Sequence, residues 1–160
     1  MRGLMFLAIT GVAIAAIVLG PWASILAVSI ALAIQAIFFG DGGITAIGAN
    51  CFNIAVIGSI SAYAVHRLVA GASPANSPRR VAAAAIAGYV SINLAALATS
   101  LELGLQPLLY RDASGAPMYA PYPWIVAVPA VMLGHLLVAG VAEALVSGGV
   151  VAYLQKSEPQ

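Results

Sequence analysis

The chain has 160 residues, of which 62% are hydrophobic and 7% are charged, and its mean hydropathy is +1.04. Soluble domains carry roughly 25% charged residues, and a soluble chain this short could not bury so much apolar surface. The composition therefore predicts an integral membrane protein and excludes a soluble enzyme. The net charge of +1 offers no basic field, so no nucleic-acid partner is expected.

Five apolar stretches meet or approach the length of about 20 residues that a helix needs to span a bilayer. They cover about residues 4–19, 21–39, 48–69, 80–103 and 124–154. The breaks between them are rich in Gly, Pro and polar residues, most clearly at Gly40–Gly43, Gly71–Pro78 and Gln106–Pro123. The sequence thus predicts an all-α, polytopic bundle of about five transmembrane helices, with residues 1–160 as a single membrane domain.

The first stretch also fits a signal peptide, because an apolar run follows Met1, Arg2 and Gly3. A signal peptide would end in a small, polar cleavage region. Here the run meets Gly20-Pro21-Trp22 and then continues apolar. The sequence therefore favours a retained helix.

Positively charged residues in short loops predict the orientation, because cytoplasmic loops are enriched in Lys and Arg. Arg67, Arg79 and Arg80 flank the loop after the third helix, and Lys156 follows the fifth helix. An even number of crossings separates the two places, so both lie on one face, which we assign to the cytoplasm. The prediction is a multi-pass protein of the cell membrane with its N-terminus outside and its C-terminus inside. The outer face would carry Asp41, Glu102, Arg111, Asp112, Tyr119, Tyr122 and Trp124.

Polar side chains at membrane depth are costly and therefore call for a reason. Gln35, Asn50, Asn53 and His135 all fall in the outer halves of the predicted helices. Such a cluster is typical of a small-ion site open to the outside, with His135 as a candidate metal ligand because imidazole is the commonest one. The alternative is hydrogen bonding between helices, worth only about 0.6 kcal/mol per contact on average.

Glu143 lies eight residues after His135, in the inner half of the fifth helix and on a similar helix face. A carboxylate at mid-membrane costs on the order of 2.5–3.5 kcal/mol, so it is predicted to contact a partner or to handle an ion or proton. His66 suits a helix C-terminus, and Cys51 is interpreted as a packing residue. The small residues of the fourth helix, from Ala82 to Ala98, fit either close packing within the chain or docking to a partner.

The segment from Gln35 to Asn50, followed by Phe52-Asn53-Ile54 and Gly58, resembles the CbiM/NikM family. That family comprises the substrate-capture components of energy-coupling-factor transporters for cobalt and nickel. Further matches are Gly20-Pro21-Trp22-Ala23, Gly134-His135, Glu143-Ala144-Leu145 and Val151-Ala152-Tyr153-Leu154, so the likeness runs from about Leu19 to Leu154.

The resemblance implies a fold of about seven helices and a division of labour among subunits. This component would capture Co²⁺ or Ni²⁺ from outside, with no permanently bound cofactor. A membrane-coupling subunit and ATPase subunits, with a possible small accessory membrane subunit, would drive uptake for cobalamin biosynthesis or nickel enzymes. Within this chain the resemblance assigns a site-supporting role to Gln35, Asp41, Gly42, Gly43, Asn50 and Asn53.

One departure from the family concerns the N-terminal metal ligands. Family members begin Met-His-Ile and carry a Ser-Gly-His segment, whereas this chain begins Met1-Arg2-Gly3 and has Leu7-Ala8-Ile9 at the second place. We therefore expect that the N-terminal ligand segment is missing, through truncation, a misplaced start or loss of function. The chain of 160 residues is accordingly expected to bind either metal loosely.

Other functions stay open at this point. The chain could be a degenerate relative that only docks partners, or a transporter component for another small solute. Sequence motifs for hydrolysis or for ATP binding are lacking, so no enzyme is predicted, and His135 with Glu143 is the one acid–base pair left for an intramembrane enzyme. Cobalt and nickel both remain open, because site affinity varies smoothly between them.

Overall fold

The computed structural model describes residues 11–157. The expectations for Met1, Arg2, Gly3 and the segment up to residue 10 lie outside these residues. Within them every regular element is a helix, and one isolated bridge joins Arg111 to Pro117. The elements are α2 (Val12–Leu19), α3 (Pro21–Ile34), the π-helix η1 (Gln35–Phe39), the 3₁₀-helix η2 (Ile44–Ala46), α4 (Ile47–Asn50), the π-helix η3 (Cys51–Gly58), α5 (Ser59–Ala70), α6 (Pro78–Leu109), α7 (Trp124–Gly134), the π-helix η4 (His135–Ala139) and α8 (Gly140–Ser157).

Several of these elements join end to end into long helices. Four such helices are long and apolar enough to cross a membrane, at Pro21–Phe39, Ile44–Ala70, Pro78–Leu109 and Trp124–Ser157. The described end of the first predicted helix, α2, has 8 residues and is about 12 Å long at 1.5 Å per residue. The predicted all-α, polytopic membrane architecture is confirmed.

The ends of the helices follow from local sequence. Gly20 adopts a φ of 80° and Pro21 then opens α3 at a position where its missing N–H is harmless. At the start of α6 the Ser77 hydroxyl accepts a hydrogen bond from the Arg79 backbone N–H, and Pro78 occupies the first turn. Gly40, with a left-handed φ of 68°, ends η1.

Three helices are longer than predicted, and α6 shows why. The sequence predicts a loop from Gln106, but α6 runs on to Leu109 with Pro107 inside it. The following loop and α7 hold this last turn: the Gln106 side chain accepts from the Ala120 N–H at 3.1 Å, and the Trp124 indole donates to the Leu101 carbonyl at 2.8 Å. Likewise, the third helix begins at Ile44 rather than near residue 48, through a short 3₁₀ turn.

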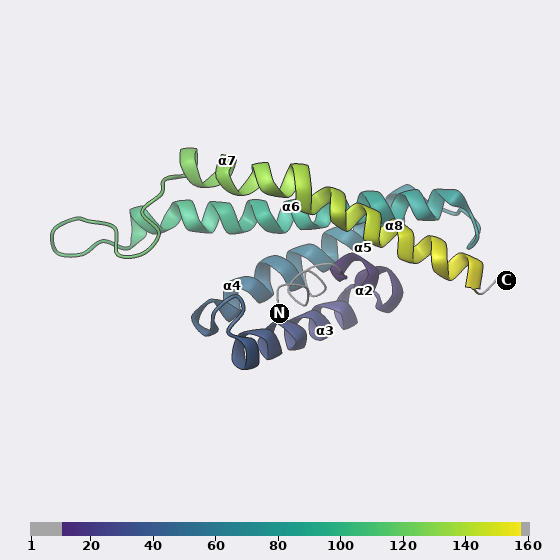
Figure 1. Ribbon diagram of the computed structural model, residues 1–160, viewed down its shortest axis with the longest axis horizontal. Coiled ribbons are helices and arrows are strands. Elements are labelled where there is room, and N and C mark those ends of the chain that lie inside the picture. The colour runs from purple at the N-terminus through teal and green to yellow at the C-terminus, as the bar shows by residue number, and fades with distance from the viewer. Residues whose placement is uncertain (1–10, 158–160) are drawn as a thin grey trace.

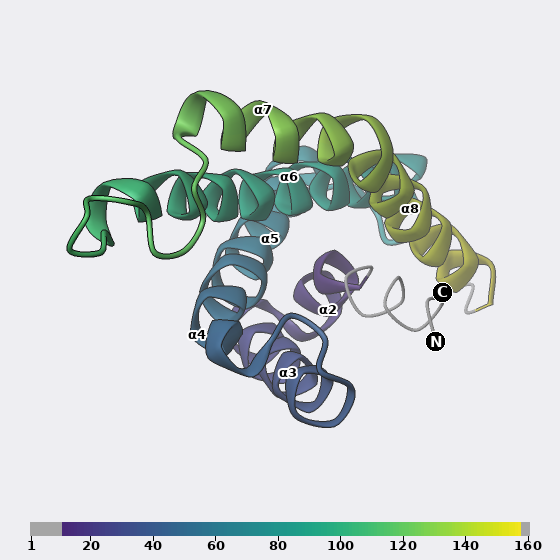
Figure 2. The ribbon, with the colours of Figure 1, turned by 60° about the vertical axis from the view of Figure 1, so that its left-hand side comes forward.

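The long helix α6 is the centre of the bundle and packs against α5, α7 and α8. As Figures 1 and 2 show, α7 lies on one side of α6, whereas α3 and α4 lie on the other. The loop between α5 and α6 and the end of α8 occupy one end of the bundle, and the Gly40–Gly43 loop and the long loop before α7 occupy the opposite end. The Gln155 side chain, which donates to the Ala75 and Ser77 carbonyls, ties the α8 end to the α5–α6 loop.

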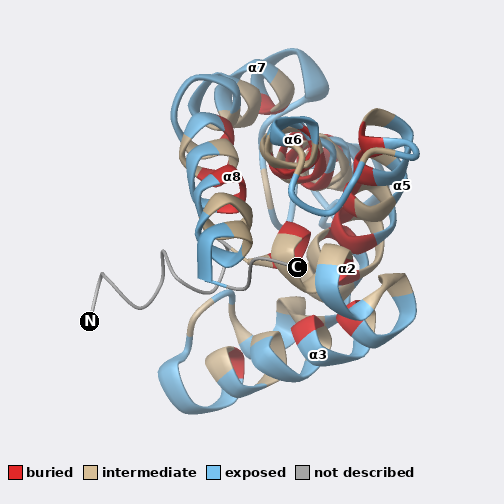
Figure 3. Cartoon of the chain, turned by 90° about the vertical axis from the view of Figure 1, so that its right-hand side faces the viewer, coloured by how far each residue is buried: buried red, intermediate tan, exposed pale blue. Residues whose placement is uncertain are grey.

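Buried positions lie mostly where helices pack against one another (Figure 3). These positions are occupied by small and polar residues, whereas many large apolar residues are exposed. The buried apolar residues are alanines apart from Val12 and Val28. The largest fully buried side chains are Glu143, Asn53 and five serines, and the Ser24 and Ser59 hydroxyls are hydrogen bonded at 2.8 Å between α3 and α5. This distribution suits a lipid solvent, in which close backbone approach and hydrogen bonds hold helices together.

Candidate functional site

A glycine-rich loop closes the end of the bundle between η1 and η2. Gly40, Gly42 and Gly43 have left-handed φ values of 68°, 73° and 74°, which side chains with a Cβ rarely adopt. The Asn50 side-chain amide donates to the Gly42 carbonyl at 3.1 Å. A Cβ on Gly42 would lie 2.6 Å from the Asn50 Nδ2 atom, so the loop needs both the glycine and the amide.

The structure places the other predicted residues of this loop beside that contact. The Gln35 backbone carbonyl accepts the Asp41 N–H at 3.2 Å, which folds the loop back on the end of η1. Asp41, Gln35 and Asn50 are each partly buried, whereas Gly42 is exposed. The residues from Gln35 to Asn50 therefore lie together at one end of the molecule, and their supporting role stays a prediction.

Asn53, three residues after Asn50, connects this loop region to α6. Its side chain is 1% exposed, and its amide donates to the Glu102 Oε2 atom at 2.7 Å and to the Thr99 hydroxyl oxygen at 3.1 Å. The Asn53 Oδ1 atom is buried with no hydrogen-bond partner. Thr99 in turn donates to the Ala95 carbonyl at 3.0 Å.

Sequence reasoning did not assign Glu102 or Thr99 to the site. It assigned Glu102 only to the outer face, because the fourth helix was expected to end near residue 103. The spacing of three residues between Thr99 and Glu102, which places both on one face of a helix, is the signal that could have found them. The structure shows that both face Asn53.

His135 lies apart from this cluster. It begins η4, and its Nδ1 atom lies 2.9 Å from the Val131 carbonyl of its own helix. The α7 helix packs on the side of α6 that faces away from α3 and α4 (Figures 1 and 2). The structure therefore does not gather His135 with Gln35, Asn50 and Asn53, and among residues 11–157 no group of three or more His, Cys, Asp and Glu residues could hold a metal ion.

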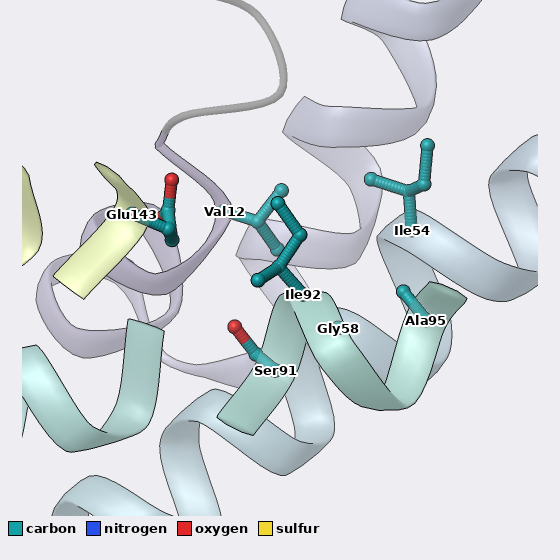
Figure 4. A pocket seen from close by; sticks show the side chains of 7 residues that line it. All are labelled: Val12, Ile54, Gly58, Ser91, Ile92, Ala95 and Glu143. Atoms are coloured by element: carbon teal, nitrogen blue, oxygen red, sulfur yellow. The ribbon is translucent and has the colours of Figure 1, made fainter. Parts of the chain in front are cut away.

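Glu143 faces the interior of the bundle rather than a surface. Its side chain is 1% exposed, Oε1 accepts from the Ser147 hydroxyl at 3.2 Å, and Oε2 is buried without a hydrogen-bond partner. A cavity of about 20 Å³ adjoins it, lined also by Val12, Ser91 and Ile92 (Figure 4). That volume accommodates about one water molecule. The predicted role of Glu143 in partner contact or ion handling stays a prediction, and its burial favours a role within the chain.

The small residues of α6 line its contact with α8. A Cβ on Gly88 would lie 2.7 Å from the Ser147 hydroxyl and 3.0 Å from the Glu143 carbonyl. Ala83, Ala84 and Ala87 are likewise buried. The sequence left two interpretations of this segment, close packing within the chain and docking to a partner. Packing within the chain accounts for these buried residues.

Comparison with known proteins identifies close relatives. The fused nickel transport protein NikMN of Rhodobacter capsulatus is 56% identical over 150 residues, which are 94% of this chain and 43% of that protein. The cobalt transport protein CbiM of Geobacter sulfurreducens is 32% identical over 93% of this chain and 40% of its own length. The chain therefore spans less than half of each of these two relatives.

A solved structure described as a transition metal transporter has the same fold. Its TM-score is 0.87 at 50% identity, over 94% of this chain and 64% of that chain. The named relatives are transport proteins, in agreement with the prediction that this chain is not an enzyme. The family described as CbiM, the cobalt uptake substrate-specific transmembrane region, matches residues 9–160. This multi-pass membrane chain thus belongs to the CbiM family, as the segment from Gln35 to Asn50 predicted.

Proposed function

We propose that this chain is the membrane part of a substrate-capture component for uptake of a divalent transition metal, Ni²⁺ or Co²⁺. The observation that carries the proposal is a pair of polar contacts at one end of the bundle. There the Asn50–Gly42 contact closes the loop, and the buried Asn53 amide holds the Glu102 carboxylate at 2.7 Å. Family membership and relatives described as nickel and cobalt transport proteins support it.

In this proposal Asn53 and Glu102 support the metal site rather than select the metal. Carboxylate and amide oxygens suit hard cations, whereas imidazole nitrogen suits nickel and related metals. The Asn53 amide orients Glu102, and partners that orient a site in this way typically contribute 10–100-fold to metal affinity or activity. The metal is the transported substrate, and no permanently bound cofactor enters the proposal.

The proposal extends to the remainder of the transporter. As the family resemblance implies, the capture component would work with a membrane-coupling subunit and ATPase subunits of the energy-coupling-factor type. The Gly40–Gly43 loop and the Asn53–Glu102 pair would contact an ion that enters from the outer face. The α5–α6 loop and the end of α8 would face the cytoplasm.

Uptake of radioactive Ni²⁺ and Co²⁺ by cells that express the whole transporter tests this function. We expect Asn50→Ala and Glu102→Gln to lower initial uptake at least several-fold when it is normalised to protein in the membrane. Thr45→Ala, at an exposed residue of η2 next to the loop, is the matched control and should retain uptake. Normal uptake by both site variants at normal protein levels would contradict a site-supporting role, and no uptake of either metal by the unmodified transporter would refute the function itself.

A further inference from the structure

The end of the bundle opposite the Gly40–Gly43 loop contains a basic hollow. It has a volume of about 570 Å³ and opens between the last turn of α2, the end of α5 and the start of α6. Arg67, Arg80, His66 and Tyr63 provide its polar lining, and Leu19 belongs to its apolar wall. Arg79, two residues after Ser77 in the first turn of α6, lies close to Gly71, which also lines the hollow.

No carboxylate neutralises these arginines within residues 11–157. The acidic residues in that part of the chain are Asp41, Glu102, Asp112 and Glu143, and none of them lines the hollow. Three guanidinium groups therefore share one end of the bundle at the edge of the apolar spans. Like charges in so small a space favour the binding of an anion.

Other groups of the protein hold the arginine side chains in place, but each guanidinium keeps N–H donors that have no partner among residues 11–157. Arg80 donates from Nε to the Ser73 carbonyl at 3.0 Å, and Arg79 donates from Nε to the Val69 carbonyl at 2.6 Å. The Arg67 guanidinium lies 5.7 Å from the centre of the Tyr63 ring and donates to its hydroxyl at 3.3 Å. A guanidinium has five N–H donors in a fork that matches phosphate oxygens, so most donors remain for a ligand.

One wall of the hollow is apolar and exposed. Val18 and Leu19 are 63% and 54% exposed at the end of α2. A second hollow of about 230 Å³ shares Val18, His66 and Arg80 with the first and continues to Leu154 of α8. A free anion or an acidic peptide would leave this wall unused, whereas the acyl chains of a lipid would cover it.

We infer that this basic hollow binds the headgroup of an anionic phospholipid. The phosphodiester lies between Arg67 and Arg80 beside His66, and the acyl chains run along Val18 and Leu19. Basic pockets between helices near the cytoplasmic surface bind anionic headgroups in this way. The inference is independent of the proposed metal transport, because it concerns the opposite end of the bundle.

Native mass spectrometry of the purified full chain in detergent tests the inference, with phosphatidylglycerol and phosphatidylcholine as probes. We expect at least tenfold better retention of one phosphatidylglycerol than of phosphatidylcholine. Arg67→Gln should reduce that retention several-fold, and the double variant Arg67→Gln/Arg80→Gln should abolish it. Arg67→Gln is informative on its own, because Arg80 also ties the α5–α6 loop and its replacement could unfold that end.

Arg111→Gln is the control, because Arg111 lies in the loop at the opposite end and its side chain donates only to the Gly115 carbonyl in the described structure. Equal retention of the two lipids would overturn the inference, as would unchanged retention in the double variant or an equal loss in Arg111→Gln. Complete displacement by millimolar inorganic phosphate would instead assign the hollow to a free anion. Loss of co-purifying partner subunits from the arginine variants, with phosphatidylglycerol retention unchanged, would reassign it to a protein contact.

Discussion

One close contact, between Gly42 and Asn50, closes the Gly40–Gly43 loop. Gly42 and Gly43 have nearly the same left-handed φ, 73° and 74°, but only Gly42 lies against the Asn50 side chain. A side chain at Gly42 or at Gly43 would therefore cost a similar conformational free energy, but only a side chain at Gly42 would also clash with Asn50. This contrast separates backbone strain from the loss of the Asn50 contact.

We predict that Gly42→Ala lowers metal uptake more than Gly43→Ala does. Both variants place a Cβ at a left-handed φ, which costs on the order of 1–2 kcal/mol, but only the Cβ at Gly42 displaces the Asn50 amide. Thermal unfolding in detergent and uptake at equal protein level measure the two effects. Equal loss of uptake in both variants would show that strain alone matters and that the Asn50 contact is dispensable.

Asp112 organises the exposed loop before α7 through a single carboxylate. Its Oδ1 atom accepts from the Ser114 hydroxyl at 2.6 Å and from the Ser114 and Ala116 N–H groups at 2.9 Å each. The hydrogen bond from the Ser114 hydroxyl, followed by those from backbone N–H groups, holds the Asp112 pKa below its ordinary value of 3.8. The loop therefore favours the charged carboxylate.

The sign of the pH dependence follows from that lowered pKa. Because the folded loop binds the proton less readily than the unfolded chain, its stabilising effect is present above the ordinary pKa of 3.8 and is lost as the pH falls through the lower, folded value. We predict that carbon-13 NMR of the Asp112 carboxyl gives a midpoint below 3.8 and that Ser114→Ala moves the midpoint upward. A midpoint at or above the ordinary value in the unmodified chain would contradict the role of Ser114.

At the scale of elements, three long helices contain a π-helical segment, and each segment contains a polar residue singled out from sequence. Gln35 begins η1, Asn53 lies in η3 and His135 begins η4. π-Helical turns occur frequently at functional sites, since the extra residue re-aims side chains. In η3 the result is visible, because Asn53 points to Glu102 and Thr99 of α6.

Two glycines of α8, Gly140 and Gly149, differ in whether α6 lies against them. A Cβ on Gly140 would lie 2.8 Å from the His135 carbonyl and 2.5 Å from the Asn93 amide, whereas a Cβ on Gly149 meets nothing within 4 Å. Overpacking of a close contact costs roughly 1–3 kcal/mol, and alanine in an open helical position gains about 1 kcal/mol over glycine. The two substitutions should therefore have opposite effects.

We predict that Gly140→Ala lowers the unfolding temperature in detergent and that Gly149→Ala leaves it unchanged or raises it. Circular dichroism at the helix band follows both transitions. If the Gly140→Ala protein were as stable as the unmodified chain, α6 and α8 could move apart without loss of stability. That result would contradict a close contact between these helices.

At the scale of the whole molecule, the bundle has two chemically different ends. One end carries Arg67, Arg79 and Arg80 with the end of α8, and the other carries the Gly40–Gly43 loop, Glu102 and the loop with Asp112. The positive-inside rule assigns the basic end to the cytoplasm. The orientation with the N-terminus outside and the C-terminus inside stays a prediction that labelling can test.

We predict that an impermeant maleimide labels a cysteine at position 114 in intact cells and does not label one at position 76. Each probe, Ser114→Cys or Asn76→Cys, is introduced into a Cys51→Ala background, because Cys51 is the only native cysteine. Position 76 should react only after the membrane is permeabilised. Labelling of position 76 in intact cells would reverse the orientation.

The sequence by itself determined the class of the molecule, its long helices and its family. Apolar stretches, prolines and glycines act locally, so Pro21 and Gly40 predicted where a helix begins and where one ends, whereas Pro78, predicted to lie in the loop, begins α6. The segment from Gln35 to Asn50 is continuous in the chain, and for that reason its loop could be recognised as one unit. The arginines near the α5–α6 loop were likewise grouped from sequence because they are neighbours in it.

Only the tertiary structure decided which polar side chains meet across helices. Helix rotation and crossing depend on packing of small residues over many turns, and periodicity alone does not supply them. Asn53 therefore meets Glu102 and Thr99 of α6, whereas His135, predicted at a similar depth, begins η4 and bonds the Val131 carbonyl of its own helix. Glu102 could not be assigned to the site from sequence, because it lies 49 residues from Asn53 in the chain and only the packing of η3 against α6 brings the two side chains together.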